Sequence, residues 1–309
     1  MSQITQQMGL TDEGLEVFTD ARPQLLDSNA FLLKCADSSL GHPDSDVATV
    51  GCFVGSEYAS GQIAIFRPSD PRLINQSVVT AAHEMLHAAF SQLSNNERAS
   101  LEALLEARWS QVPADDPIQA SFAGSVGNRS ESRSTEQFAY LGTTTIDAFE
   151  PALEEYYDRY FADRSRVVAA YVAKQTLWTS LQTEYHAASI AMQSVEHANG
   201  TESAQLQADR AQRDADFAAA TRLIDNYNAL SADERANTFV RQPDGRLGEP
   251  YGNYLNRLRS SFVSRDADLA LRQTRLDAAV VEAKVAREEV ERLLLDLETL
   301  SAATVPSRG

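Results

Sequence analysis

The chain has 309 residues, of which 43% are hydrophobic, 8% aromatic and 23% charged, and this balance excludes collagen and a largely disordered chain. Its 44 Asp and Glu residues outnumber the 27 Lys and Arg residues, which gives a formal net charge of -17. Because so acidic a surface repels phosphate backbones and anionic lipids, we expect neither nucleic acid nor a lipid surface as a partner.

The sequence shows no segment that is typical of membrane insertion or export. No apolar run reaches the roughly 18 residues that a transmembrane helix needs. The first residues lack the basic and then apolar pattern of a secretory signal peptide. We therefore expect no membrane insertion by this chain, whose length predicts about two domains.

Two cysteines, Cys35 and Cys52, lie 17 positions apart near the N-terminus. We predict that they form a disulfide, which in the chain-entropy treatment stabilises the fold by about 3 kcal/mol. Two buried free thiols in a cytoplasmic protein are the alternative. Because disulfides are typical of oxidising compartments, we expect an extracytoplasmic or cell-surface location, with a leader or anchor outside this chain.

Residues up to about 70 carry short β-like runs. Residues 47–54 and 61–67 are rich in Val, Ile and Phe, and they flank a turn-rich loop at 55–60. This pattern predicts a β-hairpin.

Three helices are predicted after the hairpin. The first begins near residues 75–77, and the second follows a Ser-x-x-Glu capping box at 94–97. Residues 112–132 are rich in Pro, Gly, Ser and Asp, so we predict a long loop there. A third, short helix is expected after the Ser-x-x-Gln capping pattern at 134–137.

From about Asp163 the sequence becomes Ala-rich and charged, with almost no Gly or Pro. We predict long helices at 163–197, 203–229 and 253–302. A break is expected at 199–200, where Asn precedes Gly. In the last helix twelve of fourteen heptad positions are apolar, which indicates a coiled coil whose seam Arg265 and Arg272 interrupt. We expect an antiparallel helical hairpin or a three-helix coiled coil, packed within the chain rather than in an obligate dimer.

Two of the five histidines lie in the motif His-Glu-Met-Leu-His at 83–87. Residues four apart share one face of a helix, so His83 and His87 are predicted to bind one Zn²⁺ ion. Glu84 lies beside them and is predicted to be the general base that takes a proton from the attacking water. Two structural histidines next to an ion-paired glutamate are the alternative.

A catalytic zinc ion takes three protein ligands and keeps one position open, so a third ligand has to come from elsewhere in the chain. The other three histidines lie in an N-terminal turn and in the coiled-coil region. A downstream glutamate is therefore the better candidate. Glu136 lies in the predicted short helix, and Glu131 and Glu150 are its alternatives.

The His-Glu-x-x-His motif at 83–87 and the Glu-x-Phe-Ala motif at 136–139 together resemble the gluzincin class of zinc metallopeptidases. Within that class, the second motif is similar to the catalytic cores of the anthrax lethal factor type and of the Pro-Pro endopeptidases. The resemblance covers about residues 40–160 and leaves the coiled coil unmatched. It implies that Glu136, not Glu131, is the third zinc ligand.

Those families place a tyrosine seven residues before the third ligand, where its hydroxyl helps to stabilise the oxyanion. Arg129 occupies that position here, either as an oxyanion donor or as a solvated loop residue. Tyr140 and Tyr58 are the other candidates, so the substrate-binding residue stays open. The resemblance also implies an edge strand that pairs with an extended peptide, and residues 61–66 are the candidate, with a plain core hairpin as the alternative.

These patterns together predict an α+β protein that is mostly helical, with a zincin-like metallopeptidase domain at 1–160 and a helical coiled-coil domain at 161–309. Its predicted function is the zinc-dependent hydrolysis of peptide bonds in a peptide or protein substrate. The alternative is a cell-surface or scaffold protein whose coiled coil is the functional part and whose zinc site is inactive or structural. The coiled coil is also the expected surface for a partner or for self-association.

Overall fold

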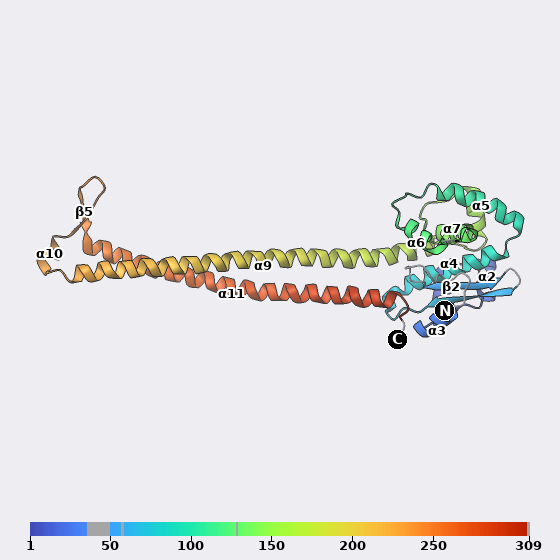
Figure 1. Cartoon of the computed structure of the whole chain (residues 1–309), viewed down its shortest axis with the longest axis horizontal. Helices are drawn as coiled ribbons and strands as arrows, with labels where there is room; N and C mark the ends of the chain where they lie inside the picture. The colour runs from blue at the N-terminus through green and yellow to red at the C-terminus, as the bar shows by residue number, and fades with distance from the viewer. Residues whose placement is uncertain (36–49, 57–58, 128, 308–309) are drawn as a thin grey trace. The chain divides into compact units, whose positions relative to one another are not determined.

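The computed structural model describes residues 1–35, 50–56, 59–127 and 129–307 (Figure 1). The chain divides into two compact units, one formed by Met1–Thr183 with Leu295–Gly309 and the other by Glu184–Leu294. The first unit is an α+β assembly with a small mixed sheet, and the second is a helical hairpin, so the predicted fold class is confirmed. The domain boundary predicted near residue 160 stays a prediction.

The sheet of the first unit has three strands in the order β1-β3-β2. Strand β3 (Ala59–Phe66) pairs antiparallel with β2 (Gly51–Ser56) and parallel with the short β1 (Gln24–Leu26). This confirms the predicted hairpin, of which residues 47–49 lie outside the described residues. The expectation that residues 61–66 form an edge strand is wrong, because β1 pairs with the far side of β3. Among the described residues, β2 is the edge strand on the other side.

The N-terminal residues are mainly helical, whereas the sequence predicts short β-like runs up to about residue 70 and no helix there. Helices α1 (Ser2–Met8), α2 (Asp12–Asp20) and α3 (Ser28–Cys35) precede β2. Thr11 caps α2 by accepting a hydrogen bond from the Gly14 backbone N–H. Cys35 at the end of α3 is joined to Cys52 in β2 with a Cα separation of 6.0 Å, so the predicted disulfide is confirmed.

Helix α4 (Ile74–Gln92) crosses the centre of the first unit and follows the 3-10 turn η1 (Pro71–Leu73). It is apolar nearly all round, and residues from Val78 to Ala89 on several of its faces are buried. Helix α5 (Asn95–Trp109) then begins at Ser94, whose side chain and that of Glu97 form the predicted capping box. This confirms the first two predicted helices.

The segment predicted as a loop at 112–132 contains helix α6 (Pro117–Val126), so that prediction is wrong. Asp116 caps α6 by accepting from the Ile118 N–H, and Ile118 and Phe122 are buried, which outweighs the loop-like composition. After the 3-10 turn η2 (Ser130–Ser132), helix α7 (Arg133–Thr144) follows. The capping pattern expected at 134–137 does not form, because α7 begins at Arg133 and Ser132 is its N-cap.

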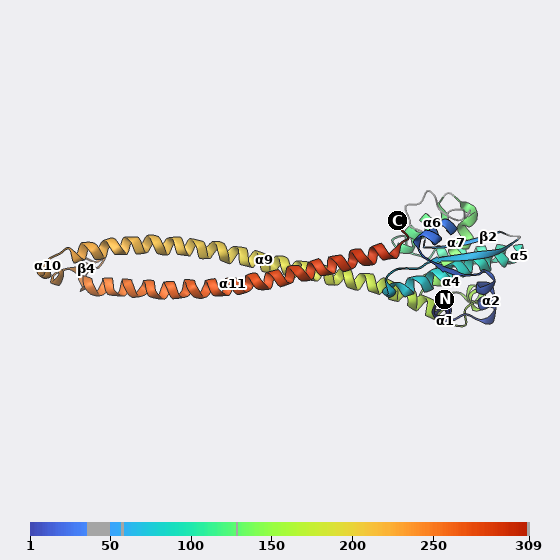
Figure 2. The ribbon, with the colours of Figure 1, turned by 90° about the horizontal axis from the view of Figure 1, so that it is seen from below.

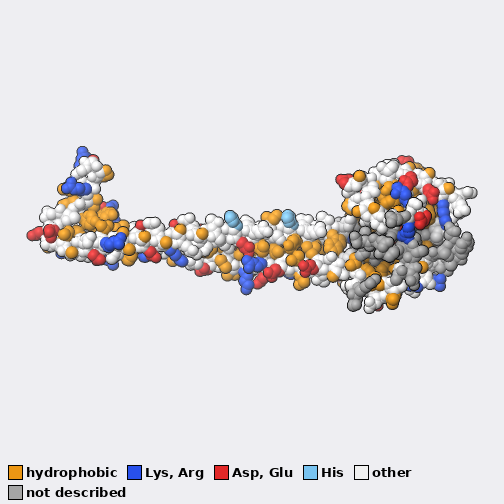
Figure 3. All heavy atoms as spheres, in the orientation of Figure 1, with side chains coloured by type: hydrophobic (Ala, Val, Ile, Leu, Met, Phe, Trp, Pro, Cys, Tyr) orange, Lys and Arg blue, Asp and Glu red, His pale blue; other side chains and the backbone are white. Residues whose placement is uncertain are grey.

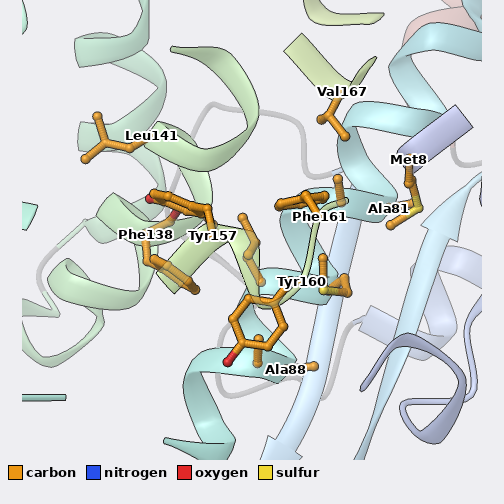
Figure 4. Packing of buried hydrophobic residues seen from close by; sticks show 14 of the residues in the cluster. Met8, Ala81, Ala88, Phe138, Leu141, Tyr157, Tyr160, Phe161 and Val167 are labelled. Atoms are coloured by element: carbon orange, nitrogen blue, oxygen red, sulfur yellow. The ribbon is translucent and has the colours of Figure 1, made fainter. Parts of the chain in front are cut away.

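The core lies where α4 and α7 pack against helix α8 (Pro151–Asp158) and the start of helix α9 (Ser165–Asn228). Figure 4 shows Phe138 and Tyr157 from this core, whose rings stack with centroids 4.8 Å apart. Tyr157 donates its hydroxyl hydrogen to the backbone oxygen of Phe138 at 3.0 Å. A Cβ atom at Gly142 would lie 2.5 Å from the Tyr157 ring and 2.6 Å from the Leu86 side chain, so only glycine allows α7 to approach this closely.

The second unit contains the parts of α9 and α11 between residues 184 and 294, and the two helices run lengthwise along each other and cross (Figures 1 and 2). At its turn are the short helix α10 (Ala232–Ala236) and the strands β4 (Phe239–Arg241) and β5 (Leu247–Pro250), and α11 spans Tyr251–Thr304. The break predicted at 199–200 is absent, because α9 continues through it. Asn199 contributes to the pairing by donating from Nδ2 to the Ala279 backbone oxygen at 2.9 Å.

The heptad seam of α11 is buried against α9 within this unit. Leu255, Phe262 and Leu276 of α11 are at most 8% exposed. The two arginines that interrupt the seam form ion pairs with carboxylates of α9. Arg265 contacts Asp216 at 2.7 Å, and Arg272 contacts both Glu202 and Asp209. Acidic and basic side chains are interspersed along the hairpin (Figure 3). None of the described helices is both long and apolar enough to cross a membrane.

Candidate metal centre

Two helices bring three metal-ligating side chains to one point. His83 and His87 lie one turn apart on α4, and Glu136 lies in the first turn of α7. The Nε2 atom of His83 lies 3.5 Å from one carboxylate oxygen of Glu136, and Nε2 of His87 lies 3.7 Å from the other. One ligand atom from each residue lies within 4.8 Å of the other two, so the three side chains form a group that can hold a metal ion.

The donor set and its spacing fit a divalent metal ion such as zinc. Two imidazole nitrogens and one carboxylate oxygen are the protein ligands of many catalytic zinc sites. Tetrahedral ligands at zinc bond lengths lie about 3.3 to 3.4 Å from each other. The two histidines lie 3.5 and 3.7 Å from different oxygens of Glu136, and all three ligand atoms lie within 4.8 Å of one another, so the side chains would have to move closer together around an ion.

A threonine next to the third ligand orients one of the histidines. Nδ1 of His87 lies 2.8 Å from Oγ1 of Thr135. When Nδ1 donates its hydrogen to this oxygen, Nε2 of the neutral ring carries no hydrogen, and its lone pair is free to bind a metal ion beside Glu136. Such an outer hydrogen bond fixes both the tautomer and the ring orientation of a metal-binding histidine. Thr135 was not among the predicted site residues, and its position beside Glu136 in the sequence was the only signal.

Glu84 lies on the side of α4 that faces strand β2. Its side chain is buried, and the Phe53 backbone N–H is a hydrogen-bond donor to it. Burial raises the pKa of Glu84 to about 7, and the charge of Glu136 raises it as well, although His83 and the Phe53 N–H act in the opposite direction. A carboxylate with a pKa near neutrality is well matched to accepting and returning a proton.

The two histidines differ in their electrostatic surroundings. Burial is the main cause that lowers the pKa of His87 to about 4, so its imidazole is neutral at physiological pH. For His83 burial also acts to lower the pKa, but the hydrogen bond and the charge of Glu136 outweigh it and raise the pKa overall. Since a metal ion binds the neutral imidazole, binding would release the proton that Glu136 favours on His83.

Of the other predicted residues, Tyr140 lies beside the ligand group. Tyr140 lies one turn after Glu136, its ring centroid 4.7 Å from that of His83, and burial raises its pKa well above the usual value. Arg129 is the N-cap of η2. Glu131 and Glu150 are exposed and do not belong to the ligand group. Tyr58 lies outside the described residues.

The metal-ligand group opens into a cavity of about 390 Å³. Its walls come from four parts of the first unit: β2, α4, the pair α6 and α7, and the start of α9 with the end of α11. Gly51 and Phe53 on β2, Glu84 on α4 and Tyr140 on α7 line it together. The general-base candidate and the metal ligands therefore line one cavity.

Gly51 allows β2 to approach α4 at this site. A Cβ atom there would overlap the Thr80 side chain and lie 2.5 Å from Oε1 of Glu84. We expect Gly51→Ala to lower the free energy of unfolding by about 1 to 3 kcal/mol through overpacking and to displace Glu84. Gly200→Ala is the matched control: nothing lies within 4 Å of its Cβ position in α9, so it should raise stability by about 0.5 to 1 kcal/mol. Urea unfolding of both variants checks this, and equal effects would contradict it.

None of the protein-family models, curated proteins or solved structures that were compared with this chain matches it. The class of the site therefore rests on its geometry. In the described residues that geometry is a buried His-His-Glu group of the His-Glu-x-x-His plus Glu pattern.

Proposed function

We propose that this chain is a zinc-dependent peptidase of the gluzincin class. The observation that carries the proposal is the convergence of His83, His87 and Glu136 on one point, with Glu84 in the same cavity. Zinc is the metal that this donor set favours, and when bound it supplies a Lewis acid that makes a water molecule nucleophilic near neutral pH. A purely structural metal site has no need of a carboxylate at Glu84.

In this proposal each residue has one task. His83, His87 and Glu136 hold the metal ion, and Thr135 fixes the His87 ring. Glu84 accepts a proton on its carboxylate from the attacking water and returns it to the leaving amine. Tyr140 keeps its hydroxyl hydrogen at neutral pH, since burial raises its pKa. Its hydroxyl oxygen lies 2.8 Å from Oγ of Ser125, and when Ser125 is the donor of that hydrogen bond, the Tyr140 hydrogen can be donated to an oxygen that gains negative charge.

Strand β2 is the proposed binding edge for an extended peptide. Phe66 donates its backbone N–H to the Val50 oxygen at 2.9 Å, so Val50 faces β3. Backbone groups of alternate residues in an antiparallel pair point to opposite sides, so the peptide groups of Gly51 and Phe53 point away from β3. The Phe53 N–H already donates to Glu84. A peptide lying along this edge would place its scissile bond beside Glu84.

We also propose that the protein acts in an oxidising compartment outside the cytoplasm. The Cys35–Cys52 disulfide supports this, because structural disulfides are rare in reducing cytosol. The disulfide also holds the end of α3 to β2, the strand that lines the cavity.

The test combines metal analysis with a peptide substrate library. The full chain, produced with its disulfide, should hold about one zinc ion and cleave members of a mixed peptide library, as detected by mass spectrometry. Removal of zinc with a chelator should abolish cleavage, and added zinc should restore it. Stoichiometric zinc without cleavage of any peptide would instead favour the scaffold function with a structural metal site.

A further inference from the structure

A lysine that is far from the metal-binding motif in the sequence lines the same cavity. Tyr171, Lys174 and Gln175 of α9 line the same cavity as His83 and Glu84. Their spacing places them on one face of the helix. The cavity therefore combines a metal-ligand group from α4 and α7 with a cationic side chain from α9.

Lys174 is one of only three lysines in the chain, and its surroundings differ from those of Lys284. Lys284 lies on the surface of α11, 77% exposed, with its Nζ atom 3.7 Å from Glu288. Lys174 is partly buried, and burial lowers its pKa. In the part of the chain that the structure describes, no carboxylate lies within ion-pair distance of it.

Burying a cation without an anionic partner costs free energy. A carboxylate that entered the cavity would offset this cost, because the charge is already desolvated and held in place by the helix. Glu84 and Glu136 are acidic residues that line the same cavity, so Lys174 is the group through which the cavity can attract an acidic ligand.

We propose that Lys174 binds a carboxylate of the peptide that is held at the metal-ligand group, and thereby selects substrates that present a carboxylate at this position. This inference rests on the proposed peptidase function, since it names the substrate class of the same site. The carboxylate comes either from an Asp or Glu side chain or from the free C-terminus of the peptide. Both sources present the same group to the Lys174 ammonium, and the experiment distinguishes them.

The experiment uses four hydroxamate probes that anchor at the zinc ion of the zinc-loaded full chain. Each carries leucine followed by one residue: a glutamine amide, a glutamate amide, a glutamine with a free C-terminal carboxylate, or a lysine amide. Affinities are measured by titration calorimetry. We expect one of the two carboxylate probes to bind at least about tenfold more tightly than the glutamine amide, as for a charge-assisted hydrogen bond, and the lysine amide to bind most weakly.

Lys174→Met should remove the preference for the carboxylate probe, whereas Lys284→Met should leave it unchanged. Lys174→Met should also unfold at the same or a higher temperature than the parent, because it removes a buried charge, so a loss of preference cannot be attributed to unfolding. Equal affinity of the parent for all four probes overturns the inference. A preference that persists in Lys174→Met overturns it as well.

The probes separate this inference from the proposed function. A carboxylate preference that depends on Lys174, in a chain that hydrolyses no peptide, would retain the binding site and reject the peptidase. Peptide hydrolysis without that preference would retain the peptidase and reject the role of Lys174. Failure of every probe to bind rejects both the zinc site and the carboxylate site.

Discussion

Glu136→Gln is expected to weaken zinc binding by more than 100-fold. Loss of an outer hydrogen-bond partner of a metal ligand costs up to about 100-fold, and loss of a ligand itself should cost more. The amide has the same shape as the carboxylate but lacks the charge that attracts the metal ion. Glu136 faces the Nε2 atoms of both histidines, at 3.5 and 3.7 Å, so its loss affects the whole group. Competition with a chromophoric chelator measures the affinity.

Two further variants make this a graded series. Thr135→Val removes the hydroxyl 2.8 Å from Nδ1 of His87 and should cost about 10- to 100-fold in affinity. Glu131→Gln changes an exposed carboxylate in η2 and should leave the affinity unchanged. If Glu131→Gln loses zinc while Glu136→Gln keeps it, the assignment of the third ligand is wrong.

Glu84→Gln should keep zinc and lower the rate of peptide hydrolysis by about 10² to 10⁴-fold, the range for loss of a general base. The glutamine carbonyl oxygen can still accept the hydrogen bond from the Phe53 N–H, so the local structure should be retained. Glu150→Gln, at an exposed position, is the matched control. A Glu84→Gln variant that hydrolyses peptides as fast as the parent would transfer the role of base to another residue.

A stability measurement tests the buried state of Glu84 without any substrate. Its pKa in the folded chain, about 7, is above the ordinary value of 4.5, so folding favours the protonated form. Between about pH 4.5 and 7, Glu84 is ionised in the unfolded chain but still protonated in the folded chain. The contribution of Glu84 to the stability of the parent therefore falls as the pH rises through this range. With zinc chelated, Glu84→Gln should gain stability relative to the parent above pH 7 and show no such gain at pH 4.

Elements with strong local signals were predictable from the sequence. The capping box at 94–97 and the heptads of α11 depend on neighbouring residues, and both are present in the structure. Helix α6 was missed because its stability comes from Ile118 and Phe122 packing into the core, against a composition typical of loops. The break at 199–200 was wrongly predicted. Asn and Gly have low helix propensity, but pairing with α11 stabilises α9 at these two residues.

The sequence by itself determined the pair His83 and His87, because a spacing of four on one helix places two side chains together whatever the rest of the chain does. It also determined that Glu84 accompanies them. Residue spacing left Glu131 and Glu150 open as third ligands and only the family resemblance favoured Glu136, whereas the tertiary structure places Glu136 in the group, because the start of α7 sets which residue faces α4. It also brought Lys174 to the same cavity, since packing of helices distant in sequence leaves no local pattern to read.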